Sequence, residues 1–447
     1  MNSPQNDVVV CKFGGTSLAD AAQIRKVAAI VRADARRRFV VVSAPGKRHA
    51  SDQKITDLLL TCWHLAGQKL DPREPLRLVR ERYEEIARDL DVPPVAAPLA
   101  HVEADLSKLA AGDADTLATR DWMAARGESF MARLLADFLE ADCVGAGECI
   151  RFDEEGLLDA VSYQNLAARM SRPGLYVIPG FYGRDAAGRI KTFPRGGSDI
   201  TGAVVARAVG ASLYENWTDV SGLLMADPRV IENPRPIEEV TYRELRELAY
   251  SGASVLHDET IFPASESGIP IQIRNTNAPD EPGTRIVAQR APGELAVVGI
   301  AGRTGFSIIT VEKANMNRQV GFGRRMLEVF EQHGVSFEHV PSGIDSLSIV
   351  ASDEQLGGKT AAIVRDLERV LEPDRIETKG DLALIATVGE GMAFRVGVAG
   401  RVFEALREAA VNVRMISQGA SEISIITGVA AADYERAVRA LYAAFVP

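Results

Sequence analysis

The sequence predicts an α/β protein: a large first part with a largely parallel central sheet, followed by a smaller part built from a repeated unit. Two observations carry this prediction. Up to about residue 290, short apolar runs typical of strands alternate with stretches that have the apolar spacing of helices. Over the remaining residues the order changes to strand–helix–strand–strand–helix–strand, and it occurs nearly twice.

Size and composition exclude several function classes. A chain of 447 residues with 46% apolar and 25% charged residues is typical of a globular protein of two or three domains. The net charge of −10 argues against a nucleic-acid partner, and no apolar run reaches the roughly 18 residues of a membrane span. The scattered Cys and His residues predict reduced thiols in the cytoplasm and no protein-built metal site.

Strand-like runs in the first part are short and apolar. They lie at Val8–Cys11, Arg38–Ser43, Gly174–Gly180, Ala211–Trp217 and Pro270–Arg274. Helical patterns lie between them, for example at 199–209, and residues 54–140 are mostly helical in pattern. We therefore expect one sheet with a helical lobe packed against it.

The last part is expected to hold two copies of one unit. The first copy has strands at 306–311, 335–340, 347–351 and 375–378, with helices at 324–333 and 358–371. The second copy has strands at 382–388, 411–416 and 423–426, with helices at 395–409 and 431–444. It ends one strand short. The run Leu295–Ile300 is expected to complete the second sheet, since an open edge beside half a core is unfavourable.

A glycine pair follows the first strand. The stretch from Lys12 to Ser17, Lys-Phe-Gly-Gly-Thr-Ser, runs from that strand into a helical pattern. Glycines let backbone N–H groups approach a ligand, a helix N-terminus favours anions, and Lys12 adds positive charge. These parts suit a phosphate; a tight turn with a capping Ser or Thr is the alternative. The spacing is neither that of the P-loop nor that of the dinucleotide fingerprint.

A second glycine pair opens the helical pattern near Asp199. It is followed by Ser198, which can cap the helix, and it is flanked by Arg195 and Asp199. An arginine fork grips a carboxylate or phosphate at two points, and Asp199 can hold a lysine in place. A capped helix with a surface Arg–Asp pair is the alternative.

Polar residues follow the strand that ends at Trp217. Ligands bind beyond the carboxyl ends of parallel strands, so Thr218 and Asp219 are placed to hydrogen-bond a ribose or a base edge. The turn Asp227-Pro228-Arg229 brings a cation that can face phosphate oxygens. A polar loop shaped by Asp-Pro is the alternative.

Glu128 follows Arg126 and Gly127 at the start of a helical run. An acid there caps the helix by default, but it can instead receive an ammonium group. Two glycine-rich turns, a lysine, an arginine and two acids together suit a nucleoside triphosphate and a small charged acid. The chemistry expected of such a set is phosphoryl transfer.

In this order and spacing the motifs resemble those of the aspartokinases, amino-acid kinases with two C-terminal ACT domains. The motifs are Lys12–Ser17, Val41–Ala44, Arg126–Glu128, Arg195–Asp199, Thr218–Val220, Asp227–Arg229 and Gly252–His257. The resemblance covers nearly the whole chain, and its architecture is similar to the lysine-sensitive monofunctional type. It implies an amino-acid-kinase fold over residues 1–294 and two ferredoxin-like ACT domains over 295–447. The first ACT domain is expected at about 304–380, and the second at about 381–447 with strand 295–301.

The resemblance implies ATP-dependent phosphorylation, with Mg²⁺, of the β-carboxylate of L-aspartate. This is the first step of aspartate-family amino-acid biosynthesis. Lys12 would stabilise the moving phosphoryl group and Asp199 would orient Lys12. The implied aspartate-binding residues are Ser43, Thr56, Glu128, Arg195, Gly197 and Ser198. The implied ATP-binding residues are Lys12, Gly14, Gly15, Thr218, Asp219, Leu224, Asp227 and Arg229.

The ACT resemblance implies feedback by an end-product amino acid, lysine or alternatively threonine. It also implies a homodimer through the ACT domains, with a tetramer as a further possibility. The implied effector-binding residues are Met316, Gln319, Gly321, Phe322, Gly323, Glu338, Ser342 and Asp345. Glu338 or Asp345 would meet the effector's ammonium group; a packing turn at the dimer seam is the alternative.

Some positions depart from the family pattern. Ser254 stands where a lysine often reaches ATP, Leu224 where a tyrosine often covers the nucleotide, and Pro194 where a glycine is usual. Two other interpretations remain, of which the second is left open by the departures at Ser254 and Leu224. One is a kinase for another amino-acid carboxylate, such as glutamate or N-acetylglutamate. The other is a catalytically silent amino-acid sensor.

Overall fold

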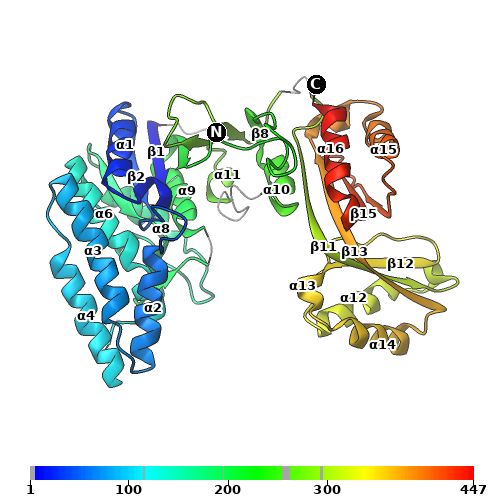
Figure 1. Cartoon of the computed structure of the whole chain (residues 1–447), viewed down its shortest axis with the longest axis horizontal. Coiled ribbons are helices and arrows are strands. Elements are labelled where there is room, and N and C mark those ends of the chain that lie inside the picture. Colours follow the sequence, from blue (N-terminus) through cyan, green and yellow to red (C-terminus); the bar gives the residue numbers. More distant parts are fainter. Residues whose placement is uncertain (1–5, 114–115, 195, 254–261, 292–294, 447) are drawn as a thin grey trace. The chain divides into compact units, whose positions relative to one another are not determined.

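The computed structural model describes residues 6–113, 116–194, 196–253, 262–291 and 295–446. Its internal contacts divide the chain into two units. The first unit consists of Met1–Leu223, Glu238–Tyr242 and Val255–Gln289, and the second of Leu224–Ile237, Arg243–Ser254 and Arg290–Pro447. Each unit is built around its own sheet (Figure 1).

The first unit contains an eight-stranded sheet in the order β3-β4-β2-β1-β7-β9-β10-β8. Its strands are β1 (Asn6–Phe13), β2 (Arg37–Val42), β3 (Asp142–Cys143), β4 (Tyr176–Pro179), β7 (Ala211–Thr218), β8 (Glu239–Thr241), β9 (Ile271–Asn275) and β10 (Thr284–Val287). Neighbouring strands in this order are parallel, except that β9 and β10 pair antiparallel. The prediction of a largely parallel sheet is therefore confirmed.

Helices cover this sheet. The helices of the first layer are α1 (Ala21–Arg32), α2 (Ile55–Gly67), α3 (Arg73–Leu90), α4 (Ala96–Ala111), α5 (Arg120–Ala124) and α6 (Arg126–Leu139). Their apolar sides share one core with Cys11 and Phe13 of β1, and they include the lobe expected for residues 54–140 (Figure 1). Helix α9 (Gly197–Val209) packs on β1 and β7 and, in turn, on α8 (Val161–Arg169). Because side chains alternate along a strand, Lys12 points to the face opposite Cys11 and Phe13.

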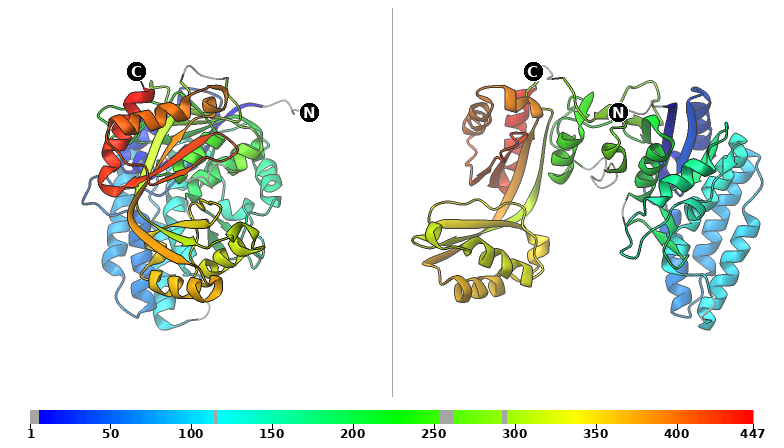
Figure 2. Two further views of the ribbon diagram at one scale, coloured as in Figure 1. Left: turned by 90° about the vertical axis from the view of Figure 1, so that its right-hand side faces the viewer. Right: turned by 180° about the vertical axis from the view of Figure 1, so that it is seen from behind.

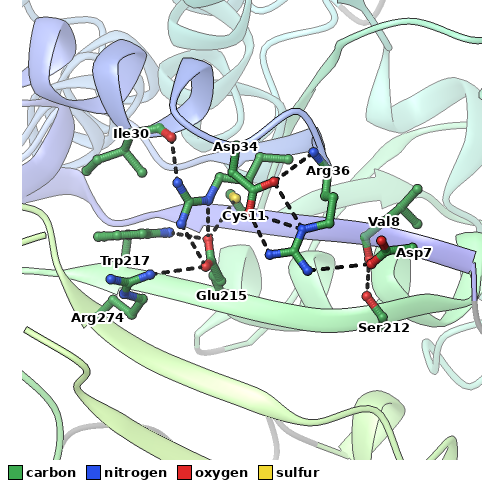
Figure 3. A network of polar contacts seen from close by, with 11 residues as sticks. Asp7, Val8, Cys11, Ile30, Asp34, Arg36, Ser212, Glu215, Trp217 and Arg274 are labelled. Carbon is green, nitrogen blue, oxygen red and sulfur yellow. Dashed lines mark hydrogen bonds and ion pairs between the residues drawn. The ribbon is translucent and has the colours of Figure 1, made fainter. Parts of the chain in front are cut away.

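A buried ionic network ties four neighbouring strands of this sheet together (Figure 3). Glu215 on β7 accepts hydrogen bonds from Arg37 of β2 at 2.8 and 3.0 Å, from the Trp217 indole at 3.0 Å and from the Cys11 thiol of β1 at 3.3 Å. Arg274 of β9 lies 3.4 Å from the same carboxylate. Burial pushes the pKa of Glu215 up, but the Arg37 hydrogen bonds and charge outweigh it, so the pKa lies below its ordinary value.

The second unit contains a five-stranded sheet in the order β12-β11-β13-β15-β14, with antiparallel neighbours. Two strands, β11 (Gly299–Glu312) and β13 (Arg375–Val388), run through both halves of this sheet (Figure 2). One half adds β12 (Ser346–Ser352) with α12 (Phe322–Gln332), α13 (Asp353–Leu356) and α14 (Thr360–Leu371). The other adds β14 (Met415–Ser417) and β15 (Ser424–Ala430) with α15 (Val398–Glu408) and α16 (Tyr434–Phe445). This is the two-copy arrangement that the sequence predicts.

The two copies share one sheet, whereas the sequence analysis expected two. The first residues of β11, Gly299–Arg303, pair with Leu384–Val388 of β13. The segment after Leu295 therefore pairs with the second copy, as the orphan-strand hypothesis requires. The strand expected at 335–340 is wrong: this segment meets β12 only through a bridge between His339 and Val350. Strand pairing fails near both ends of this segment. The Ser336 N–H donates to a side chain, and Pro341 has no N–H to donate to a neighbouring strand.

Among the described residues, no helix is long and apolar enough to cross a membrane. Further regular elements are a two-stranded hairpin of β5 (Tyr182–Arg184) and β6 (Ile190–Thr192) and the short helices α7 (Ala146–Cys149), α10 (Tyr242–Tyr250) and α11 (Phe262–Glu266).

Candidate active site

The centre of the candidate site is a buried ion pair between β1 and α9. The Lys12 ammonium lies 2.6 Å from Oδ1 of Asp199, and their side chains are 9% and 19% exposed. Lys12 is the second-last residue of β1, and Asp199 lies in the first turn of α9. The sequence predicts that Asp199 can hold a lysine, and the structure brings these two residues together.

Asn216 is a third member of this group that the sequence analysis missed. Its side-chain Nδ2 donates to Oδ1 of Asp199 at 2.8 Å, and its Oδ1 lies 3.5 Å from the Lys12 ammonium. It is 3% exposed and belongs to β7, the strand beside β1. In the sequence, Asn216 could have been noticed as a polar residue inside a strand that is otherwise largely buried.

The first glycine pair forms a tight turn between β1 and the loop after β2. The Gly14 N–H donates to the Trp217 carbonyl at 2.9 Å, and the Gly46 N–H donates to the Gly15 carbonyl at 2.8 Å. A Cβ on Gly15 would lie 2.9 Å from the Ala44 carbonyl oxygen, which no side chain tolerates. A Cβ on Gly14 would meet only ordinary contacts, including Lys12 Nζ at 3.7 Å. Packing therefore explains Gly15, whereas at Gly14 a Cβ would fit in ordinary contact with its neighbours.

The helix after this turn begins later than the sequence indicates. Residues Gly15–Leu18 form a short 3₁₀ helix, and α1 starts at Ala21 with the Asp20 side chain capping the Gln23 N–H. Ser17 does not cap it; its hydroxyl pairs with that of Thr276 at 2.7 Å. The capping interpretation of Ser17 is therefore wrong, because Asp20 already satisfies the free N–H of α1.

The second glycine pair, Gly196 and Gly197, lies where the chain enters α9 after β6, and it packs against the residues that follow β4. A Cβ on Gly180 would lie 2.7 Å from Ser198, and a Cβ on Gly197 would lie 2.6 Å from the Phe181 ring. The N-cap of α9 is Gly196 at φ 57, and no side chain caps the helix there. Ser198 therefore lies within α9 and is not its cap. The close approach places Gly197 and Ser198 beside the carboxyl end of β4, next to β2.

Glu128 is buried in the first turn of α6. It is 5% exposed, and its Oε2 atom has no hydrogen-bond partner among the described residues. Burial raises its pKa to about 7, against the opposing effects of backbone N–H groups of Glu128 and Ala44 and of the Arg126 charge. A buried carboxyl with an open oxygen is suited to an ammonium group that arrives with a ligand.

Ser43 and Thr56 bracket the loop after β2. The Ser43 N–H donates to the Phe13 carbonyl at 3.2 Å, so Ser43 lies beside the end of β1. Thr56 lies in the first turn of α2 and is partly exposed. The loop between them is held from α3, because buried Arg82 donates to the Gly46 carbonyl at 3.1 Å and to Asp52 at 2.6 Å.

Thr218 is the last residue of β7, one residue later than the sequence predicts for the strand end, and Asp219 follows it. The Thr218 hydroxyl donates to Asp219 at 3.3 Å, and its carbonyl accepts from the Thr276 N–H at 2.9 Å. Both residues are at least partly exposed at the carboxyl end of the sheet, the end at which open α/β sheets bind ligands.

The remaining expected nucleotide contacts belong to the second unit. Leu224 is 38% exposed, and the Arg229 guanidinium forms an ion pair with Asp227 at 2.6 Å. Arg229 is thus engaged with its own turn. Arg195, expected to bind the aspartate carboxylate, and Ser254 lie outside the described residues.

Several of the expected effector residues lie at or near the start of α12, whereas Glu338 lies beside Arg303 of β11. Met316 and Phe322 are buried, and Gly321 at φ 80 precedes the helix. The Asp345 carboxylate accepts the Asn315 N–H at 2.8 Å, and Glu338 pairs with Arg303 at 3.4 Å. The full expected set here is Met316, Gln319, Gly321, Phe322, Gly323, Glu338, Ser342 and Asp345. Both expected ammonium acceptors already have protein partners, so an effector would share them.

Comparison with known proteins places this geometry in a family. Residues 7–275 match the model of the amino acid kinase family, and residues 385–445 match that of the ACT domain. Aspartokinase 3 of Bacillus subtilis (strain 168) is 43% identical over 447 residues, covering 98% of both chains. The solved aspartate kinase of Clostridium acetobutylicum is 45% identical with a TM-score of 0.89, covering 98% of this chain and 100% of the other.

Aspartokinase III of E. coli has been solved in two complexes. The complex with aspartate and ADP is 29% identical with a TM-score of 0.75, covering 98% of this chain and 99% of the other. The complex with lysine and aspartate is 28% identical with a TM-score of 0.76, covering 99% and 100%. An amino acid kinase unit joined to ACT units thus defines the class. The chain belongs to the aspartokinase family.

Proposed function

We propose that the site around Lys12 and Asp199 carries the ATP-dependent phosphorylation of the β-carboxylate of L-aspartate, giving 4-phospho-L-aspartate. The observation that supports it most is the buried 2.6 Å pair of Lys12 and Asp199 beside the Gly14–Gly15 turn. A positive charge held in a fixed position is what a moving phosphoryl group requires.

Lys12 stabilises the charge that develops on the transferring phosphoryl group. The carboxylate oxygen of aspartate is already a nucleophile, so the reaction needs no general base. Catalysis then consists of positioning and charge stabilisation. Asp199 holds the lysine at the carboxyl end of β1, and Gly14 lines the path by which the phosphate approaches.

Aspartate binds between α6 and the loop after β2. Glu128, with its open oxygen, receives the α-ammonium group, and Ser43 and Thr56 line the pocket. Gly197 and Ser198 at the start of α9 add backbone N–H groups near the reacting carboxylate. Arg195, by its motif, takes the α-carboxylate.

ATP binds at the carboxyl end of β7 and brings Mg²⁺ with it. Thr218 and Asp219 hold the nucleoside, and the assignment extends to Leu224, Asp227 and Arg229 by resemblance. The described residues contain no group of three or more His, Cys, Asp or Glu that could hold a metal. Mg²⁺ needs only one or two protein carboxylates when phosphates supply the other oxygens.

We also propose the regulatory arrangement. Residues 1–294 are assigned to the catalytic domain and 295–447 to the two ACT domains, while residues 224–237 and 243–254 make their contacts with the second unit. The ACT domains pair to make a homodimer in the cytoplasm and bind lysine, or threonine, as effector. The complex of E. coli aspartokinase III with lysine and aspartate supports lysine over threonine. Calorimetric titration with each amino acid tests this proposal, which would be rejected if neither lysine nor threonine binds.

A coupled assay of ADP release separates the possible reactions. We expect turnover with aspartate, ATP and Mg²⁺. Turnover with glutamate or N-acetylglutamate, and none with aspartate, would assign a different carboxylate kinase. Nucleotide and amino-acid binding without any turnover would assign a silent sensor.

A further inference from the structure

We infer that Asn216 is a positioning residue that fixes the Asp199 carboxylate against the Lys12 ammonium. This inference rests on the proposed roles of Lys12 and Asp199. The reaction chemistry alone does not require an asparagine at this position, so the inference adds a residue to the proposed site. The three side chains come from β1, β7 and α9, so their geometry depends on how these elements meet.

The hydrogen-bond donors decide the orientation of the Asn216 amide. Asp199 Oδ1 accepts from both Lys12 Nζ at 2.6 Å and Asn216 Nδ2 at 2.8 Å. A carboxylate only accepts, so the amide must turn its NH₂ group toward Asp199 and its oxygen toward Lys12. The 3.5 Å separation between that oxygen and Lys12 Nζ is long, so the contact with Asp199 carries most of the effect.

Burial makes this arrangement rigid. Asn216 is 3% exposed, so its amide has little access to water and depends on these partners. On the same face of β7, the Tyr214 hydroxyl donates to the backbone carbonyl of Asp199 at 3.1 Å. Tyr214 therefore holds the start of α9, whereas Asn216 holds the side chain of Asp199.

The opposite face of β7 is fixed independently. Glu215 and Trp217, the neighbours of Asn216, belong to the buried network of Figure 3. Because that network ties β7 to β1 and β2, Asn216 projects from a strand whose register cannot shift easily.

An amide also suits the charge balance of this site. Lys12 and Asp199 together are neutral, and Asn216 adds a donor and an acceptor without adding charge. A carboxylate in its place would give a net negative group beside the phosphate path, which would repel ATP.

The test compares Asn216→Ala with Asp199→Asn and the double variant. We expect Asn216→Ala to lower kcat about tenfold to a hundredfold while KM values change less than about twofold, as for a group acting in the transition state. We expect the double variant to turn over at the rate of Asp199→Asn alone, because Asn216 acts through Asp199. Multiplicative losses in the double variant would overturn the inference.

Two further variants exclude a merely structural role. Ser212→Ala, which removes a β7 hydrogen bond to the Val8 carbonyl far from Lys12, should leave kcat unchanged. Tyr214→Phe should lower Tm with a much smaller loss of kcat than Asn216→Ala. If Tyr214→Phe and Asn216→Ala lower Tm equally and also lower kcat equally, the positioning role of Asn216 is refuted. Normal activity of Lys12→Ala would refute the proposed function itself. If Lys12→Ala loses activity and Asn216→Ala keeps it, only the inference about Asn216 is refuted.

Discussion

The Gly46 N–H donates to the carbonyl oxygen of Gly15 at 2.8 Å, joining the loop after β2 to the turn after β1. Two segments of the proposed site, one for aspartate and one for the phosphate path, are thereby held at a fixed separation. Arg82 supports the same loop from α3 through the Gly46 carbonyl. A rigid separation of this kind suits a reaction in which positioning supplies most of the rate.

The loss of Lys12 should abolish most of the turnover. We expect Lys12→Ala to lower kcat by at least about 10²–10³-fold, because a charge that stabilises the transition state is removed. Steady-state ADP release measures this. Lys26→Ala on α1, which removes an exposed hydrogen bond to Asn277, is the matched control and should keep full activity. Near-normal activity of Lys12→Ala would refute its assigned role.

The affinity for aspartate should fall below about pH 7. The pKa of Glu128 is raised to about 7 by burial, so in the free enzyme the carboxyl becomes protonated as the pH drops through that value. A neutral Glu128 cannot pair with the substrate's ammonium, so kcat/KM for aspartate should fall up to about tenfold per pH unit. Glu128→Gln should show a low, flat profile. A wild-type profile that stays flat down to about pH 5.5 would contradict this assignment.

The same carboxyl should reduce the stability of the ligand-free protein at high pH. A pKa raised from 4.5 to about 7 means that the folded state binds this proton more tightly than the unfolded state. The stabilisation is therefore complete below about pH 4.5 and is lost as the pH rises through about 7, by about 3 kcal/mol in total. We expect Glu128→Gln to unfold at higher denaturant than wild type at about pH 8, with the gap closing at about pH 5. An unchanged gap would show that Glu128 is not the titrating group.

A methyl group at Gly15 should disrupt the turn. In Gly15→Ala the new Cβ would lie 2.9 Å from the Ala44 carbonyl and 3.2 Å from the Gly46 nitrogen, both backbone atoms. We expect a stability loss of about 1–3 kcal/mol with reduced kcat. Gly67→Ala at the end of α2 meets nothing within 4 Å and should be neutral or slightly stabilising. Denaturant unfolding and kinetics on both variants check this; equal behaviour would count against the close approach.

Removing the charge of Glu215 should destabilise the first unit. Glu215→Gln leaves the Arg37 guanidinium, which is 9% exposed, without its anion. Breaking one partner of a buried pair typically costs about 3–5 kcal/mol. Glu103→Gln, which breaks an exposed ion pair with Arg80, should cost less than about 1 kcal/mol. Calorimetric unfolding compares them, and similar Tm values for the two variants would disprove the importance of the network.

Much of this site could be predicted from the sequence, because its parts are local patterns. The glycine pairs, Lys12 and Asp199 stand at strand ends and helix starts, and apolar periodicity locates both. Asn216 was missed because its partner is distant in sequence and only the packing of α9 on β7 brings them together.

Other misses have equally physical causes. Residues 335–340 have strand-like composition, but backbone pairing at an edge also needs free N–H groups in register, which composition does not report. The use of residues 224–237 and 243–254 in the second unit depends on the path of the chain between two sheets. No local pattern encodes that path.

The two long strands of the second unit have a mechanical consequence. A strand of 14 residues is about 46 Å long at about 3.3 Å per residue. Positive φ at Gly305 and Asp381, with shifted pairing around Phe306, marks the single point at which β11 and β13 bend together. Two domains on a single tether would move independently, whereas these two halves share the backbone hydrogen bonds of β11 and β13. A ligand that changes the pairing of these strands in one half therefore acts on strands that the other half also uses.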